Sequence, residues 1–156
     1  EFRRVLFRSR RTPAPGSSQA VLVGAETVRR DNPFLTARLG DVVIEPLRVV
    51  MGVAPASAHV HPCLEMTGEP HQVLEDLGAR DVVQVLIEGG PTTLGRFLEA
   101  GVVNRLVWYI APAWAGGSST LGALEFLTTP SMKELRRGHL VSVRSIGENI
   151  RIDVEV

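Results

Sequence analysis

The chain has 156 residues, 44% of them hydrophobic and 22% charged, which predicts one soluble domain built around a single core. Its 17 basic residues balance 17 acidic ones, so the composition argues against nucleic acid or an anionic membrane surface as the main partner. No apolar run has the length of a membrane span and no signal peptide is recognisable, so we expect a cytoplasmic protein. The single cysteine, Cys63, excludes an intramolecular disulfide and a cysteine-rich zinc site.

Two unusual segments begin the chain. Residues 1–9, EFRRVLFRS, are what the translation of a common sequencing-library adapter gives, and we interpret them as an artefact that stands outside the fold. A natural basic arm is the alternative. Residues 10–18 are rich in Pro, Gly and Ser and predict a disordered lead-in. We therefore expect the ordered domain to occupy residues 19–156.

The first ordered elements are a strand and a short helix. Residues 20–24, AVLVG, form an apolar run typical of a strand buried on both faces, and residues 25–32 have helical character up to Pro33. Several candidate ligand-binding residues would then lie just past the end of this strand, on a turn, the short helix and a loop. These candidates are Thr27, Asp31, Leu35, Thr36 and Arg38. The alternatives need no ligand: Asp31 would serve only to end the helix and form a turn, and Arg38 would be a charged side chain in solvent.

Another buried strand is predicted at residues 46–52, and a helix at residues 70–79. Between them, His59, His61 and Cys63 alternate along the chain and could share one side of an extended segment. Pro62 interrupts that segment and no acidic ligand is fixed nearby. We therefore expect loop histidines and no metal site.

The stretch around which the domain is organised is residues 82–98. A β-branched run at 82–87 leads to Glu88, two glycines and Pro91, and then to a helix predicted at 92–100. Gly89 and Gly90 can take positive φ and would let a ligand lie close to the backbone. The helix start that follows, with the hydroxyls of Thr92 and Thr93, would attract phosphate. An ordinary strand-to-helix turn remains the alternative for a bare pair of glycines.

The rest of the chain predicts strands. Residues 105–111 form a further buried strand, and residues 140–146 and 150–156 alternate apolar and polar side chains around Gly147. These last two segments predict a terminal antiparallel hairpin. The expected fold class is α/β, with a mixed, mostly parallel sheet flanked by helices and closed by the hairpin.

Three segments together identify a resemblance: GAETVRRDNPFLTAR, PLRVVMG and VLIEGGPTTLGRFLEAGVVNRLVWYIAP. They resemble the reductase domain of the bacterial bifunctional riboflavin biosynthesis protein, which has the dihydrofolate-reductase fold. The resemblance covers nearly all of residues 19–156 in the right order. It implies NADPH-dependent reduction of 5-amino-6-(5-phosphoribosylamino)uracil, a small phosphorylated pyrimidine, and a homodimer.

The resemblance also implies roles for individual residues. Leu35, Arg38 and Glu88 would contact the substrate, and Thr27 and Asp31 the nicotinamide cofactor. The phosphate-binding turn of the cofactor site would comprise Gly89, Gly90, Pro91, Thr92, Thr93, Leu94, Gly95 and Arg96. No catalytic acid is assigned, because no histidine falls within a recognised motif.

Three departures from the family's pattern qualify the resemblance. The family's first strand should precede Gln19, so we expect that strand to be missing. The segment of residues 52–69 is shorter than in the family, which usually has another strand there. The structure of the sheet edge, and of the adenosine end of the cofactor site, is therefore not predicted. The zinc deaminase domain that usually accompanies the reductase is not recognisable. A related reductase of the same fold with another substrate, or a catalytically silent dimerisation or binding fragment, are the alternatives.

Overall fold

The structure is a computed structural model that describes residues 3–8, 19–39, 42–113, 124 and 131–156. The predicted lead-in at residues 10–18 lies outside the described residues. Among the residues that are described, no helix is long and apolar enough to cross a membrane.

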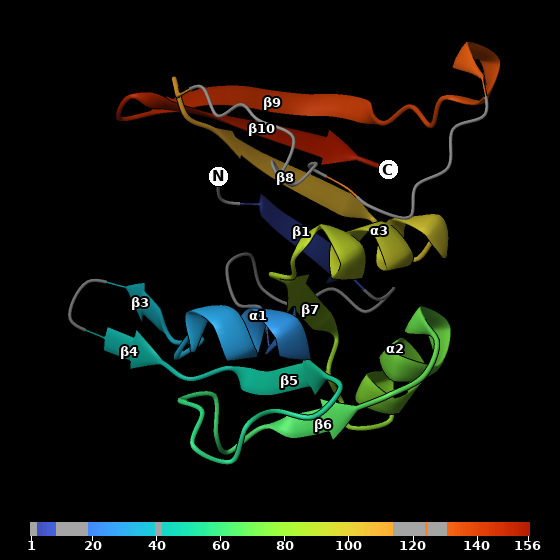
Figure 1. Cartoon of the computed structure of the whole chain (residues 1–156). Helices are drawn as coiled ribbons and strands as arrows, with labels where there is room; N and C mark the ends of the chain where they lie inside the picture. The colour runs from blue at the N-terminus through green and yellow to red at the C-terminus, as the bar shows by residue number, and fades with distance from the viewer. Residues whose placement is uncertain (1–2, 9–18, 40–41, 114–123, 125–130) are drawn as a thin grey trace.

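Over the described residues, the fold is one eight-stranded mixed sheet with three α-helices and a separate two-stranded sheet (Figure 1). The helices are α1 (Ala25–Asp31), α2 (Pro70–Gly78) and α3 (Pro91–Glu99), and a 3₁₀ turn covers Met132–Glu134. The strands of the large sheet, in spatial order, are β6 (Leu64–Met66), β5 (Leu47–Met51), β2 (Ala20–Gly24), β7 (Gln84–Ile87), β1 (Arg3–Arg8), β8 (Arg105–Ile110), β10 (Asn149–Glu155) and β9 (His139–Ile146). The small sheet pairs β3 (Ala37–Leu39) with β4 (Val42–Ile44).

The large sheet has a parallel half and an antiparallel half. Strands β6, β5, β2 and β7 are parallel to one another, whereas β8, β10 and β9 form antiparallel pairs. Strand β1 lies between the halves and runs antiparallel to β7 and to β8. The segment that the sequence analysis excluded from the fold thus takes a central position in the sheet.

Two apolar clusters cover opposite faces of the sheet. Successive residues of a strand point to opposite faces, and Leu22 and Val23 of β2 accordingly belong to different clusters. The larger cluster packs α2 and α3 against one face, with Leu77 and Phe97 fully buried. The smaller cluster packs Val28 of α1 against the other face. Strand β2 is buried along its whole length because helices cover both faces.

Local sequence explains where the longer helices begin. At α2, the Glu69 side chain accepts from the backbone of the first turn and the Gln72 side chain accepts from the N–H of Glu69, which forms a capping box ahead of Pro70. At α3, Gly90 is the N-cap and Pro91 takes the first helical position, where no N–H is needed.

Most predicted elements are confirmed to within two residues, and the edge of the sheet gives a correction. Residues 52–69 contain the short parallel strand β6, which pairs with β5 and receives a hydrogen bond at Met66 O from Gly52 N at 2.9 Å. The strand that the segment seemed too short to hold is therefore present. Helix α2 ends as predicted, but β7 begins at Gln84, because Val82 N donates to Leu77 O and belongs to the turn after the helix.

A buried carboxylate fixes the antiparallel half. Asp153 of β10 has no exposed surface and accepts hydrogen bonds from Arg105 at 2.6 Å, Arg151 at 2.7 Å and Ser142 at 3.1 Å. Burial alone would raise the pKa of Asp153, but the hydrogen bonds from Arg151, Arg105 and Ser142 outweigh it and hold the pKa well below its usual range. The carboxylate is therefore charged throughout the neutral range and ties β8, β9 and β10 together.

Candidate functional site

The candidate site lies at the edge of the sheet where parallel strands end. Strand pairing aligns Leu22 of β2 with Ile87 of β7 and Gly24 with Met51 of β5, so the three carboxyl ends meet there. Helices α1 and α3 both begin at this edge, directly after β2 and just after β7 (Figure 1). Open α/β sheets bind their ligands at such an edge.

The two helix starts approach each other closely. A Cβ atom added to Gly90 would lie 3.7 Å from Oγ1 of Thr27, an ordinary contact, and would meet no other described residue within 4 Å. Two residues from separate predicted motifs, one from the α1 segment and one from the glycine turn, are thus neighbours in space. The space around a Cβ at Gly90 is thus much less crowded than at Gly89.

The other glycines of the site have a packing role instead. A Cβ on Gly89 would lie 2.6 Å from Cβ of Thr93, and a Cβ on Gly24 would lie 2.7 Å from its Oγ1. Thr93 therefore fills the space that both glycines leave. Although glycine can take positive φ, neither Gly89 nor Gly90 does so here, and Gly90 has φ −65°. Sequence analysis missed Gly24, although its position at the strand end was a signal.

The first turn of α3 is suited to an anion. Gly90 provides no side-chain oxygen to cap the helix, and its carbonyl accepts from Leu94 N at 3.1 Å. The amide groups of the first turn lack acceptors within the helix, and the helix dipole places partial positive charge there. Pro91 and Thr93 are half-buried and Thr92 is exposed, so this turn reaches the surface.

The later residues predicted for the turn point elsewhere. Leu94 is fully buried in the larger core cluster and Gly95 is buried within the helix, so neither offers a side chain to a ligand. Arg96 donates to Gly68 O at 3.4 Å and to Glu69 Oε1 at 3.5 Å, at the start of α2. The structure thus places Arg96 beside a second helix start on the same edge.

Helix α1 presents its two predicted residues on one face. Thr27 and Asp31 are four residues apart, about 6 Å along the axis, and such pairs share a face of a helix. Asp31 is exposed, and its Oδ1 lies 3.9 Å from Nε of Arg30. Two residues past the helix end have left-handed backbones: Asn32 with φ 41° and Leu35 with φ 51°. This conformation is unfavourable for leucine, and such outliers gather at functional sites.

The remaining predicted substrate contacts come from two places. Glu88 follows β7 directly, is half-buried, and donates its backbone N–H to Leu22 O at 2.9 Å. Arg38 was expected in a loop, but its backbone lies in β3, paired with Val43 of β4. The structure therefore brings Thr27, Glu88 and Gly90 to one edge, while Arg38 belongs to the small separate sheet.

The comparisons with known proteins agree with this architecture. The family model described as "RibD C-terminal domain" matches residues 16–152. The riboflavin biosynthesis protein RibD of Mycobacterium tuberculosis is 37% identical over 147 residues, which cover 88% of this chain and 42% of that protein. The corresponding protein of Bacillus amyloliquefaciens is 29% identical over 170 residues and is covered to 46%. The chain thus spans less than half the length of these relatives.

Solved structures show the same fold. Form 2 of Acinetobacter baumannii RibD has a TM-score of 0.76 at 23% identity, covering 88% of this chain and 47% of that one. The Saccharomyces riboflavin biosynthesis reductase Rib7 has a TM-score of 0.63 at 17% identity, covering 88% of this chain and 75% of that one. Because the family model matches residues 16–152, which is most of this chain, the chain belongs to the RibD C-terminal domain family.

Proposed function

We propose that this domain reduces 5-amino-6-(5-phosphoribosylamino)uracil to its ribitylamino product, with NADPH as the cofactor. The observation that carries the proposal is the approach of Thr27 to the open backbone of Gly90, which builds one site from two motifs. The names of the structural relatives support the reaction class: one is a riboflavin biosynthesis reductase, and another, from Thermotoga maritima, carries the deaminase and 5-amino-6-(5-phosphoribosylamino)uracil reductase names.

The residues present fit a dinucleotide. A Cβ at Gly90 would meet only Oγ1 of Thr27 among the described residues, at 3.7 Å, and a glycine there would let a pyrophosphate lie close to the backbone at the first turn of α3. The amide groups of that turn would hold the phosphates, and Thr27 with Asp31 would hold the nicotinamide end. Bound there, the nicotinamide would supply the hydride for the reduction.

The protein's own contribution is position and electrostatics. Glu88, at the end of β7, would accept hydrogen bonds from amino groups of the pyrimidine or from ribose hydroxyls. Arg38 would grip the substrate phosphate through its planar set of donors. Leu35, held in the left-handed region, would pack against the substrate. We assign no general acid, and solvent or substrate would return the final proton.

Calorimetry with NADPH and with the phosphorylated substrate tests this proposal on the full chain. We expect the parent to bind NADPH, and Gly90→Val to lower that affinity without loss of fold, because Gly90 already has an extended backbone that valine can adopt. Turnover of the phosphoribosylamino substrate, followed by the loss of NADPH absorbance, would establish the reaction. Failure of the parent to bind NADPH would contradict the proposal.

The two alternatives give different results in the same assay. A related reductase of the same fold would bind NADPH but would turn over another pyrimidine or pterin in place of this substrate. A silent dimerisation or binding fragment would bind neither ligand. The retention of Thr27, Asp31, Arg38 and Glu88 favours the active reductase over that fragment.

We also propose that the domain forms a homodimer through the antiparallel half of its sheet. Ile110, Val143 and Ile150 are between 43% and 55% exposed, and strand pairing places them on the apolar face that α3 covers further along. An uncovered apolar sheet face is typical of an interface between copies of a chain. Light scattering should give the mass of a dimer for the parent and of a monomer for Val143→Asp.

A further inference from the structure

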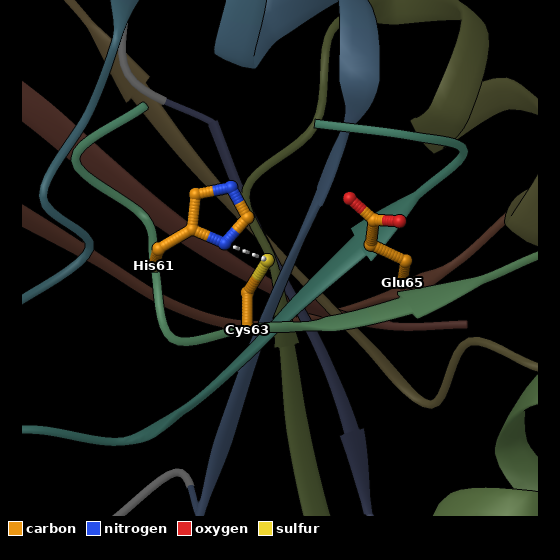
Figure 2. Close-up of side chains that lie close together, drawn as sticks. All are labelled: His61, Cys63 and Glu65. Carbon is orange, nitrogen blue, oxygen red and sulfur yellow. Dashed lines mark hydrogen bonds between the residues drawn. The ribbon is translucent and has the colours of Figure 1, made fainter. Parts of the chain in front are cut away.

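A group of three potential metal ligands lies at the edge strand of the sheet. One ligand atom from each of His61, Cys63 and Glu65 lies within 4.8 Å of the other two, and Figure 2 shows the three side chains rising on the same side of the chain. Alternating residues of an extended segment share a side, which explains the arrangement. The ligand-bearing segment thus runs from the loop after β5 into β6.

The group differs from the alternating residues singled out in the sequence, because it contains His61, Cys63 and Glu65 in place of His59, His61 and Cys63. His59 does not join the group, because its backbone N–H donates to Oδ1 of Asn32 at 2.8 Å and its ring stacks on Phe34 at 4.1 Å between centroids. The acidic ligand that the sequence seemed to lack is Glu65, which the pairing of β6 with β5 fixes in place.

The imidazole of His61 is oriented like that of a metal ligand. Its Nε2 atom lies 3.0 Å from the carbonyl oxygen of Pro55. A carbonyl can only accept, so Nε2 carries the hydrogen and Nδ1 keeps its lone pair. That lone pair faces the sulfur of Cys63 at 3.6 Å. Metal-binding histidines characteristically donate their second ring N–H to a carbonyl or carboxylate in this way.

The carboxylate of Glu65 is also held in position by the loop. Its Oε1 atom accepts the backbone N–H of Ala54 at 2.8 Å, and among the described residues no further partner is recorded for Oε2. A carboxylate that uses one oxygen for the backbone keeps the other available for a cation.

The alternative role for a Cys–His pair is nucleophilic catalysis, which requires a thiol that ionises easily. Here burial, followed by the charge of Glu65, raises the pKa of Cys63, and Arg48 only partly opposes this. A divalent cation would offset the crowding of the thiolate with the carboxylate, so the surroundings favour a metal ligand over a nucleophile.

We propose that Nδ1 of His61, Sγ of Cys63 and a carboxylate oxygen of Glu65 bind a zinc ion, with water as the fourth ligand. Imidazole, thiolate and carboxylate are the donors that zinc accepts. Tetrahedral bonds of about 2.1 and 2.3 Å place nitrogen and sulfur about 3.6 Å apart. The observed separation of these two atoms is 3.6 Å. To coordinate the same ion, the carboxylate oxygen of Glu65 would have to move by about 1 Å, which rotation of its side chain allows.

Zinc at this position would tie the loop at residues 53–63 to the edge strand. The same loop also contacts the α1 segment, because Arg29 donates to Val53 O at 3.5 Å and Oδ1 of Asn32 accepts from the backbone N–H of His59. Helix α1 carries Thr27 and Asp31. The ion would therefore stabilise the loop that supports one side of the candidate site.

Zinc titration of the full chain by calorimetry, together with cobalt(II) absorption spectroscopy, tests the site. We expect one ion per chain, release of about one proton as the thiol ionises, and a sulfur-to-cobalt charge-transfer band. Cys63→Ser should remove the band and weaken zinc binding by about tenfold or more. Glu65→Gln keeps the acceptor for Ala54 N but removes the charge, and should also weaken binding. His139→Gln, on β9 at the opposite edge of the sheet, is the matched control and should change nothing.

The proposal would be overturned by a cobalt spectrum of the parent without the sulfur band, or by zinc affinities that Cys63→Ser and Glu65→Gln leave unchanged. Circular dichroism would establish that each variant is folded. Thermal unfolding of the parent is an independent measurement, because an ion that binds only the folded chain must raise the melting temperature. A melting temperature that zinc does not raise and a chelator does not lower would equally reject the site.

Discussion

Two adjacent glycines allow the packing and binding roles of the α3 turn to be separated. A Cβ atom on Gly89 would lie 2.6 Å from Cβ and 2.9 Å from Cγ2 of Thr93, whereas a Cβ on Gly90 would meet only Oγ1 of Thr27 at 3.7 Å. Cβ of Thr93 is fixed to the helix backbone and cannot rotate away. Gly89→Ala therefore forces a backbone shift that should cost about 1–3 kcal/mol. Gly90→Ala should change stability by less than about 1 kcal/mol, because alanine fits its φ of −65°.

The assay is thermal unfolding together with NADPH calorimetry on both variants. For a domain of this size, the loss at Gly89 corresponds to a melting temperature lower by about 2–12 °C. Gly90→Ala should melt close to the parent but bind NADPH about tenfold more weakly, since the added methyl group faces the space for the phosphates. Each variant thus serves as the control for the other.

The reasoning fails if the two effects do not separate. A Gly89→Ala variant as stable as the parent would mean that Thr93 adjusts without cost. An unchanged NADPH affinity in Gly90→Ala would mean that the phosphates do not lie against this turn. Loss of stability in both variants to the same extent would show that the turn is simply a tight strand-to-helix connection.

Three further predictions concern substrate binding, the core and acid stability. Arg38→Ala should weaken substrate binding by about tenfold while NADPH affinity stays within about twofold, both by calorimetry; an equal loss for the cofactor would reject the assignment. Phe97→Ala, which truncates the largest fully buried side chain, should lower the free energy of unfolding by about 3–5 kcal/mol in urea denaturation. Asp153→Asn should cost about 3–5 kcal/mol at neutral pH, because buried hydrogen-bonded charge is lost beside Arg105 and Arg151. With the pKa of Asp153 lowered in the folded state, its contribution is complete above about pH 4, the unfolded value, and declines as the pH falls toward the folded value. Asp153→Asn should lack this acid-dependent step.

Local patterns were sufficient for the elements that define the parallel half. The runs that became β2, β5 and β7 are short, apolar and bounded by turn residues, and each ends at a helix start or a glycine. Gly90 and Pro91 predicted the beginning of α3 because their conformational preferences are local properties. Thr27 and Gly90, chosen from separate motifs, are neighbours in the structure.

Features that depend on distant partners could not be predicted. Strand β6 has three residues and exists through its pairing with β5, which no periodicity within residues 64–66 reveals. The packing of Thr93 against Gly24 joins residues 69 positions apart (93 − 24), so neither residue identifies the other from sequence. Glu65 reads as one more surface acid until β6 places it beside Cys63. The sequence likewise did not reveal that Gly89 leaves out its Cβ for close packing against Thr93 and does not use positive φ.

The position of β1 determines how the two halves of the sheet can separate during partial unfolding. In the described sheet β7 and β8 are not neighbours, so every backbone ladder between the two halves passes through the six residues of β1. Amide hydrogen exchange should therefore report two cooperative units joined at a seam, with the amides of β7 and β8 that face β1 losing protection together. The turn at Gly90 and the start of α1 both belong to the parallel unit. Fluctuations that separate the halves would leave the two helix starts facing each other, so ligand occupancy and seam opening should be weakly coupled.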